Sequence, residues 1–164
     1  MSDFRIGHGY DIHRLIESEP LVICGEKVES PVGSLGHSDG DVGIHAICDA
    51  ILGALAYGDL GTHFPSSDPE WEDIDSRCFL DEVLEKMDLA GYAINNIDCT
   101  IILQSPHIST YVEAMRQRIA DYCYLDINQV SVKATTTDKL GSIGRGEGIA
   151  ASAIVLLNEV SDES

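Results

Sequence analysis

Apolar and polar residues alternate along this chain with two periods, which predict helices in some segments and strands in others. Between residues 44 and 55, large apolar side chains recur at every third or fourth position, the spacing that places them on one face of an α-helix. The side-chain oxygen of Ser38 or Asp39 can cap the first turn of this helix. The hydrophobic pattern predicts two further helices at residues 76–90 and 109–124.

Runs rich in β-branched residues predict the strands. They lie at residues 4–10, 21–30, 92–104, 130–137 and 148–157. The second run reads as two short strands joined by a turn at Gly25 and Glu26. Residues 58–75 are rich in turn-forming residues and are expected to form an exposed loop. Because strands and helices do not alternate strictly, we predict an α+β fold in one domain, residues 1–164.

The composition excludes one class of partner and constrains the substrate site. With 28 acidic and 10 basic residues, the chain carries a formal net charge of −18 at pH 7, whereas binding to a nucleic-acid backbone needs a basic surface. We therefore expect no nucleic-acid partner. An anionic substrate would be repelled at long range, so its site must supply local positive charge from metal ions, helix N-termini or a few Arg and Lys side chains.

The N-terminal sequence and the cysteine pattern predict a cytoplasmic, bacterial-type protein. The N-terminus has no apolar signal core, and no stretch approaches the ~20 apolar residues of a membrane span, so no membrane association is expected. The five cysteines form no Cys-x-x-Cys pair, which indicates reduced thiols in a reducing compartment. A plastid leader that had already been removed would leave the same sequence.

Candidate metal ligands occur just after the first predicted strand and in the first predicted helix. Asp11 and His13 are two residues apart, so in extended backbone their side chains project from the same face. Asp41, His45 and Asp49 are spaced by four residues and share one stripe of the helix. One Asp and two His suit Zn²⁺ with a fourth position open for substrate, and Asp41 or Asp49 could hydrogen-bond a ligating imidazole. An isolated Asp-x-His is also common in ordinary capping turns, so the spacing alone leaves both interpretations open.

A run of three threonines in the segment KATTTDKLGSIGRGEG suits phosphate binding. Hydroxyl and backbone N–H groups at residues 135–137 can donate hydrogen bonds to phosphate oxygens. Asp138 could hold a divalent cation, and Arg145 could contact a phosphate through two N–H groups. The alternative is an edge strand followed by a Gly-rich turn, because threonine favours strands in any case. The sequence contains neither a Walker A motif nor a Gly-x-Ser-x-Gly motif.

Five segments of the chain form a combined signature. They read RIGHGYDIHRL, HSDGDVGIHAICDAILGALAYGDLGTHFP, DSR, KATTTDKLG and GRGEGIA, and they span nearly the whole chain. Together they resemble the 2-C-methyl-D-erythritol 2,4-cyclodiphosphate synthase family, in which they occur in the same order. The resemblance implies a phosphorus–oxygen lyase of the non-mevalonate isoprenoid pathway. It would convert 4-CDP-2-C-methyl-D-erythritol 2-phosphate to the 2,4-cyclodiphosphate and CMP.

The resemblance also implies a fold, an assembly and two kinds of metal ion. The fold would be a mixed four-stranded sheet with helices packed on one face. Three copies would form a homotrimer with the sheets inside and each site at a subunit interface. One Zn²⁺ per subunit would be bound by Asp11, His13 and His45, and a second divalent ion, Mg²⁺ or Mn²⁺, by Asp138 together with substrate. His37 and Thr136 match the catalytic positions of the family.

Further residues match positions that contact the CDP-linked substrate in the family. They are Asp11, His13, Ser38, Asp59, Leu60, Gly61, Phe64, Asp68, Leu103, Pro106, His107, Ala134, Thr135, Thr137, Asp138, Ser142 and Arg145. The family pattern also pairs Arg145 with Glu147. Three residues depart from that pattern: Asp138 replaces a longer Glu, His107 replaces a Lys or Arg, and Ser142 replaces a bulky residue.

Two alternatives to the cyclase stay open at this point. A zinc-dependent phosphoesterase acting on CDP-type substrates would give linear hydrolysis products. A trimeric binding module for a nucleotide or an isoprenoid would carry a structural zinc, which usually has four protein ligands.

Overall fold

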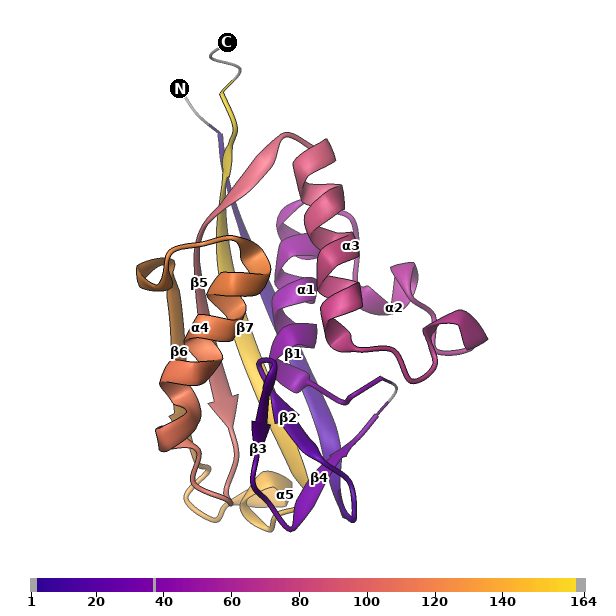
Figure 1. The fold of residues 1–164 in the computed structure, drawn as a ribbon, viewed down its shortest axis with the longest axis vertical. Coiled ribbons are helices and arrows are strands. Elements are labelled where there is room, and N and C mark those ends of the chain that lie inside the picture. Colours follow the sequence, from indigo (N-terminus) through magenta and orange to yellow (C-terminus); the bar gives the residue numbers. More distant parts are fainter. Residues whose placement is uncertain (1–2, 37, 162–164) are drawn as a thin grey trace.

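The computed structural model describes residues 3–36 and 38–161 (Figure 1). The strands are β1 (Phe4–Glu17), β2 (Leu21–Ile23), β3 (Glu26–Val28), β4 (Val32–Leu35), β5 (Tyr92–Ile102), β6 (Val130–Thr135) and β7 (Gly148–Glu159). The α-helices are α1 (Val42–Ala54), α2 (Leu60–His63), α3 (Ser76–Leu89), α4 (Val112–Cys123) and α5 (Gly141–Gly144). Short 3₁₀ helices are η1 (Pro69–Trp71), η2 (Ser109–Tyr111) and η3 (Ile127–Gln129).

The central sheet has five strands, in the order β4-β1-β7-β5-β6, rather than the four expected. It is mixed, as predicted, because β5 and β6 run parallel while the other neighbours are antiparallel. The additional strand is β4, which pairs with the end of β1. A four-residue strand that contains a glycine and a serine gives almost no strand signal in a sequence. Strands β2 and β3 form a separate hairpin, whose turn lies at Cys24 and Gly25, one residue earlier than expected.

Helices α1, α3 and α4 cover one face of the sheet and leave the other face open (Figure 1). The core lies between these layers and includes Ile47, Ile51, Leu80 and Ile119. Side chains alternate along β1, so its odd-numbered residues face the helices and its even-numbered residues face the open side. The open face exposes 71% of Ile6, 54% of Tyr10 and 50% of Ile12. A gathering of exposed apolar side chains is typical of surfaces that contact another molecule.

The N-cap of helix α1 is Asp41, not Ser38 or Asp39 as expected. Its carboxylate accepts a hydrogen bond from the N–H of Ile44 in the first turn (3.1 Å). It also accepts two hydrogen bonds from the backbone of the β2–β3 turn (2.8 and 2.6 Å). One buried carboxylate thus satisfies three backbone donors, which makes Asp41 the better cap and ties the start of α1 to the hairpin.

The other helices lie close to where the sequence predicts them. Helix α3 ends one residue earlier than expected, and residues 109–124 divide into η2 and α4. The segment 58–75 is largely exposed, as predicted, but contains α2 and η1. In the described part of the chain, no helix combines the length and apolarity that a membrane crossing requires.

Helix α1 lies directly against β1 because two glycines leave room for it. A Cβ atom at Gly7 would overlap the carbonyl oxygen of Ala50, and one at Gly9 would overlap that of Ala46. The helix and the strand can therefore make this contact only where the strand has no side chain. As a result, α1 reaches the same strand that carries Asp11 and His13.

Replacing Gly9 by alanine is expected to lower the free energy of unfolding by about 2–4 kcal/mol, because the added methyl group must push α1 away from β1. Gly53→Ala on α1 is the matched control, since the single neighbour of its Cβ within 4 Å would be His8 O at 3.9 Å. That control should be neutral or stabilising by about 0.5–1 kcal/mol. Urea denaturation measures both effects, and equal stabilities of the two variants would contradict the tight contact.

Candidate metal centre and substrate site

Three side chains expected to bind a metal converge on one point. Asp11 Oδ2 lies 2.7 Å from His13 Nε2 and 3.2 Å from His45 Nδ1. The two imidazole nitrogens are 3.4 Å apart. One ligand atom from each residue lies within 4.8 Å of the other two. The structure therefore contains the possible metal-binding triad that the sequence predicts.

Strand β1 and helix α1 position the triad. Strand β1 continues to Glu17 instead of ending near residue 10 as expected, so Asp11 and His13 lie in extended backbone and point to the same side. His45 lies in the first turn of α1 and is 7% exposed. Because α1 rests on the glycines of β1, the His45 imidazole reaches the two strand residues.

Asp11 and His13 shift each other's pKa in the triad. Burial by itself would raise the pKa of Asp11, but hydrogen bonds and charge interactions with His13 and His45 outweigh burial and lower this pKa to about 2. Burial also opposes the charged form of His13, yet its contact with Asp11 raises the pKa of His13 above the ordinary 6.5. In the metal-free protein, Asp11 is therefore ionised at neutral pH, and His13 retains a proton to higher pH than an ordinary histidine.

The affinity for Zn²⁺ is expected to fall as the pH falls, because the ion must displace the proton that His13 holds. Below the raised pKa of His13, displacing one proton costs about tenfold in affinity per pH unit. Above that pKa the affinity should level off. Competition with a chelator at about pH 5.5, 6.5 and 7.5 measures the slope. An affinity that does not change over this range would contradict the prediction.

The second nitrogen of His45 faces a partner that the sequence did not suggest. Asp41 or Asp49 was expected to hydrogen-bond a ligating imidazole, but within the described residues neither carboxylate bonds to the His45 ring. Asp41 turns back to cap its own helix, and Asp49 accepts a hydrogen bond from the N–H of Leu60 (2.7 Å). His45 Nε2 instead lies 2.9 Å from Ser76 Oγ. Ser76 begins another helix 31 residues later, a distance that helical periodicity cannot bridge.

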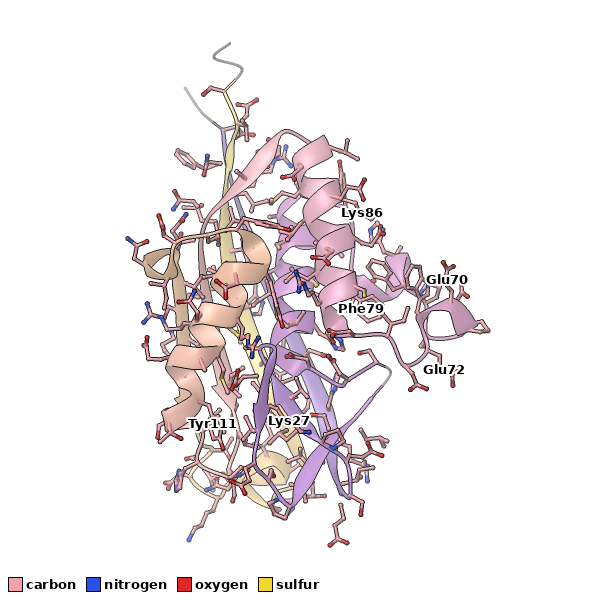
Figure 2. The ribbon with its side chains drawn as sticks, viewed as in Figure 1. Lys27, Glu70, Glu72, Phe79, Lys86 and Tyr111 are labelled. Carbon is pink, nitrogen blue, oxygen red and sulfur yellow. The ribbon has the colours of Figure 1, made fainter. Side chains whose placement is uncertain are left out.

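A cavity of about 300 Å³ lies beside the triad. Its lining consists of Asp11, His13, Gly36, His45, Asp49, Leu60 and Gly61. An adjoining cavity of about 270 Å³ shares His45, Leu60 and Gly61 and adds aromatic side chains, including Phe64 and Phe79. Figure 2 shows Phe79 on α3, on the side toward α2, and its ring centroid is 4.9 Å from that of Phe64. Leu60, Gly61 and Phe64, all expected to contact substrate, are thus brought to the triad.

Two predicted substrate ligands in the same segment line neither of these cavities. The Asp59 carboxylate caps α2 and accepts hydrogen bonds from the N–H and Oγ1 of Thr62 (2.8 and 2.7 Å). The Asp68 carboxylate caps η1 by accepting a hydrogen bond from the N–H of Glu70 (3.0 Å). Ser38 does reach the triad, since its Oγ is 3.3 Å from His45 Nε2. His37 lies outside the described residues.

The threonine segment forms a second site. A cavity of about 310 Å³ is lined by Leu103, Pro106, His107, Ile108, Ser109, Ala134, Thr135 and Thr136. Beyond it, Thr137 Oγ1 donates to Leu140 O (2.7 Å), and the N–H of the exposed Asp138 donates to Thr136 Oγ1 (3.2 Å). The exposed Arg145 pairs with Glu147 (2.6 Å), as expected. Ser142 lines a separate cavity of about 240 Å³ together with His13.

The triad and the threonine segment do not meet within one chain. Asp11 pairs with Ala151, Ala151 with Ile101, and Ile101 with Ala134, so the four residues form one row across the sheet. Three strand spacings, about 14 Å, therefore separate Asp11 from Ala134. Both groups can contact one substrate only if that substrate is extended or if two chains bring them together.

Comparison with known proteins identifies the family. The YgbB family model matches residues 4–158. A Pseudoalteromonas atlantica relative is 51% identical over 157 residues, which is 96% of this chain and 97% of the relative. A Bacillus subtilis relative is 52% identical over 156 residues, 95% of this chain and 99% of the relative. Both are named 2-C-methyl-D-erythritol 2,4-cyclodiphosphate synthase.

Solved structures agree with the sequence relatives. The bifunctional IspDF of Campylobacter jejuni superposes with a TM-score of 0.94 at 37% identity, and the match covers 98% of this chain but 44% of that protein. The CDP complex of Plasmodium falciparum IspF has a TM-score of 0.85 at 36% identity and covers 98% of this chain and 99% of that one. A synthase in its CDP-bound form has a TM-score of 0.87 at 35% identity and covers 93% and 99%.

These similarities decide between the hypotheses about the reaction. The relatives carry the synthase name over nearly their whole length, and no observation supports the zinc phosphoesterase. The match to residues 4–158 includes both the triad and the threonine segment. The chain therefore belongs to the YgbB family, and its relatives are 2-C-methyl-D-erythritol 2,4-cyclodiphosphate synthases.

Proposed function

We propose that this protein is a cyclase of the non-mevalonate isoprenoid pathway that converts 4-CDP-2-C-methyl-D-erythritol 2-phosphate to 2-C-methyl-D-erythritol 2,4-cyclodiphosphate and CMP. The observation that carries this function is the convergence of Asp11, His13 and His45 beside a cavity, in a chain 51% identical to a synthase of that product. Two similar structures are complexes with CDP, which supports a CDP-linked substrate.

The triad fits Zn²⁺. One carboxylate and two imidazoles form a typical donor set for catalytic zinc, with a fourth position open. Tetrahedral bonds of about 2.05 Å place ligand atoms roughly 3.3 Å apart, and the atoms of the triad are 2.7 to 3.4 Å apart. A bound zinc would act as a Lewis acid and supply positive charge for the diphosphate. The cluster has three members among the described residues, which favours this role over a structural zinc with four protein ligands.

The reaction exchanges one phosphorus–oxygen bond for another. An oxygen of the 2-phosphate forms a bond to the β-phosphorus of the CDP group. The bond from this phosphorus to the oxygen shared with the α-phosphate breaks, and CMP leaves with that oxygen. Because both reacting groups belong to one molecule, the protein has to position them and neutralise their charge, and it needs no general base.

We assign the positioning of the substrate to two groups of residues. Ser38 and His37 would bind the 2-phosphate end beside the triad, and Asp59 with Gly61 would bind the ribose. The cavity next to Ala134 would hold cytosine, and Thr136 would bind the diphosphate as the second catalytic residue. The Thr136 hydroxyl accepts a hydrogen bond from the N–H of Asp138 (3.2 Å), which leaves its own proton available to a phosphate oxygen.

We assign a second divalent ion, Mg²⁺ or Mn²⁺, to Asp138. Its carboxylate is exposed and offers the oxygen ligand that these ions prefer. The exposed Arg145 would add positive charge to the same region. The free thiols of all five cysteines agree with the reducing cytoplasm that we infer for this enzyme.

A homotrimer is expected in solution. Two observations support this assembly: the open face of the sheet exposes Ile6, Tyr10 and Ile12, and the two halves of the site are about 14 Å apart in one chain. A trimer that packs the open faces together would bury the apolar residues and could join the triad of one subunit to the threonine segment of the next. Sedimentation equilibrium should give three times the chain mass of 17.8 kDa. A monomer at micromolar concentration would contradict the assembly.

The reaction is tested by incubating the protein with the CDP-linked substrate and analysing the products. Cyclic diphosphate and CMP in equal amounts support the cyclase. Linear hydrolysis products would contradict the cyclase and indicate a phosphoesterase. A chelator should stop CMP release, and added Zn²⁺ together with Mg²⁺ should restore it.

A further inference from the structure

Ser76 contacts the outer side of a proposed metal ligand from a helix that carries no ligand of the triad. Its Oγ is 2.9 Å from His45 Nε2, while His45 Nδ1 faces Asp11 and His13. The Ser76 side chain is buried, with 1% exposed. Among the partners of His45, Ser38 Oγ is farther from Nε2, at 3.3 Å, and is only half-buried.

Asp39 holds Ser76 in place. The Ser76 hydroxyl is hydrogen-bonded to Asp39 Oδ1, and the Ser76 N–H donates to Asp39 Oδ2 (3.2 Å). The N–H of Asp41 also donates to Asp39 Oδ1 (3.1 Å). The Asp39 carboxylate is therefore fixed by two backbone donors, one at the start of α3 and one at the start of α1.

The direction of these hydrogen bonds sets the state of the imidazole. An ionised carboxylate can only accept, so the Ser76 hydroxyl donates its proton to Asp39. The lone pair of Ser76 Oγ then faces His45, and His45 Nε2 must carry the proton that it donates. With the proton on Nε2, the lone pair of Nδ1 points toward Asp11 and His13, where the metal would bind.

We propose that Ser76 and Asp39 are positioning residues that hold His45 in the tautomer and orientation required to bind the metal through Nδ1. This inference rests on the proposed zinc centre. Ligating histidines usually donate their second N–H to a carboxylate or carbonyl, and the loss of such a partner weakens metal binding by about 10- to 100-fold. Here a serine connects the histidine to the carboxylate.

The test compares zinc affinities by chelator competition in the full-length protein. Ser76→Ala should bind Zn²⁺ about 10- to 100-fold more weakly than the wild type. Ser76→Thr, which keeps the hydroxyl, should recover most of this affinity. Ser34→Ala is the matched control, because Ser34 is also a buried serine and its Oγ has no hydrogen-bond partner in the described part of the chain. The control should stay within about twofold of the wild type.

A second readout follows the imidazole itself. In the zinc-loaded wild type, ¹H–¹⁵N spectra should show a His45 Nε2–H protected from exchange, and Asp39→Asn should weaken this protection even if Ser76→Ala fails to fold. A wild-type affinity in folded Ser76→Ala, or a wild-type Nε2 that carries no proton, would overturn the positioning role and leave the zinc centre intact. A wild type that binds no Zn²⁺ would overturn both the positioning role and the proposed function.

Discussion

His13→Ala is expected to lower the rate of CMP release about a thousandfold or more. The substitution removes one of the three proposed ligands, so the remaining carboxylate and imidazole would hold the ion weakly and out of place. The charge stabilisation that a metal supplies to a phosphoryl transfer amounts to several kcal/mol, and each 1.4 kcal/mol corresponds to about tenfold in rate. The measurement is single-turnover CMP release at saturating Zn²⁺ and Mg²⁺.

His63→Ala is the control for this experiment. His63 lies on α2, next to Phe64 in the sequence. Its Nε2 is hydrogen-bonded to the backbone oxygen of Tyr57 (2.8 Å), and it is not part of the triad. Its loss should change the rate by about twofold at most. If His13→Ala releases CMP as fast as His63→Ala, the proposal that the zinc centre is catalytic is wrong.

Asp41→Ala is expected to lower the free energy of unfolding by about 3–5 kcal/mol. The Asp41 side chain is 1% exposed and accepts hydrogen bonds from the N–H groups of Cys24, Gly25 and Ile44. Alanine would leave these donors without their partner, at about 1–3 kcal/mol for each buried group, and would remove the cap of α1. Because α1 carries His45, the affinity for zinc should fall together with the stability.

Asp75→Ala separates capping from burial. Asp75 also caps a helix, since it accepts a hydrogen bond from the N–H of Arg77 (2.8 Å), but it is exposed, and within the described residues its carboxylate bonds to no hairpin. Asp75→Ala should lower the free energy of unfolding by only about 1 kcal/mol. Urea denaturation with an unchanged m-value measures both variants. If Asp41→Ala and Asp75→Ala lower the free energy of unfolding equally, the hydrogen bonds from Asp41 to the β2–β3 turn contribute nothing to stability.

Local patterns in the sequence predicted much of the fold and part of the arrangement of the candidate metal ligands. The alternation of side chains in extended backbone places Asp11 and His13 on one face, and the helical period places His45 on the same helix as the apolar residues between 44 and 55. These relations depend on residues a few positions apart, so the backbone geometry alone determines them. The segments shared with the synthase family then predicted which of these side chains would bind a metal.

Relations between distant segments were decided only by the tertiary structure. The sequence shows the glycines of β1, but only packing reveals that they admit α1 and bring His45 to the strand. Strand β4 is too short to have a signal of its own and forms because the end of β1 offers it an open edge. In the same way, the nearest hydrogen-bond partner of His45 Nε2 is Ser76 Oγ rather than a side chain of its own helix.

The sequence by itself determined the class of fold, through short-range periodicity, and the members of the candidate triad, through a signature spread along the whole chain. The tertiary structure alone decided that Asp41 caps α1, that Asp39 and Ser76 contact each other and Ser76 contacts His45, and that β1, which carries Asp11 and His13, is separated by two strands from β6, which leads into the threonine segment. The physical reason is that hydrogen bonds and close packing join atoms that meet in space, and a linear pattern carries no record of which segments meet.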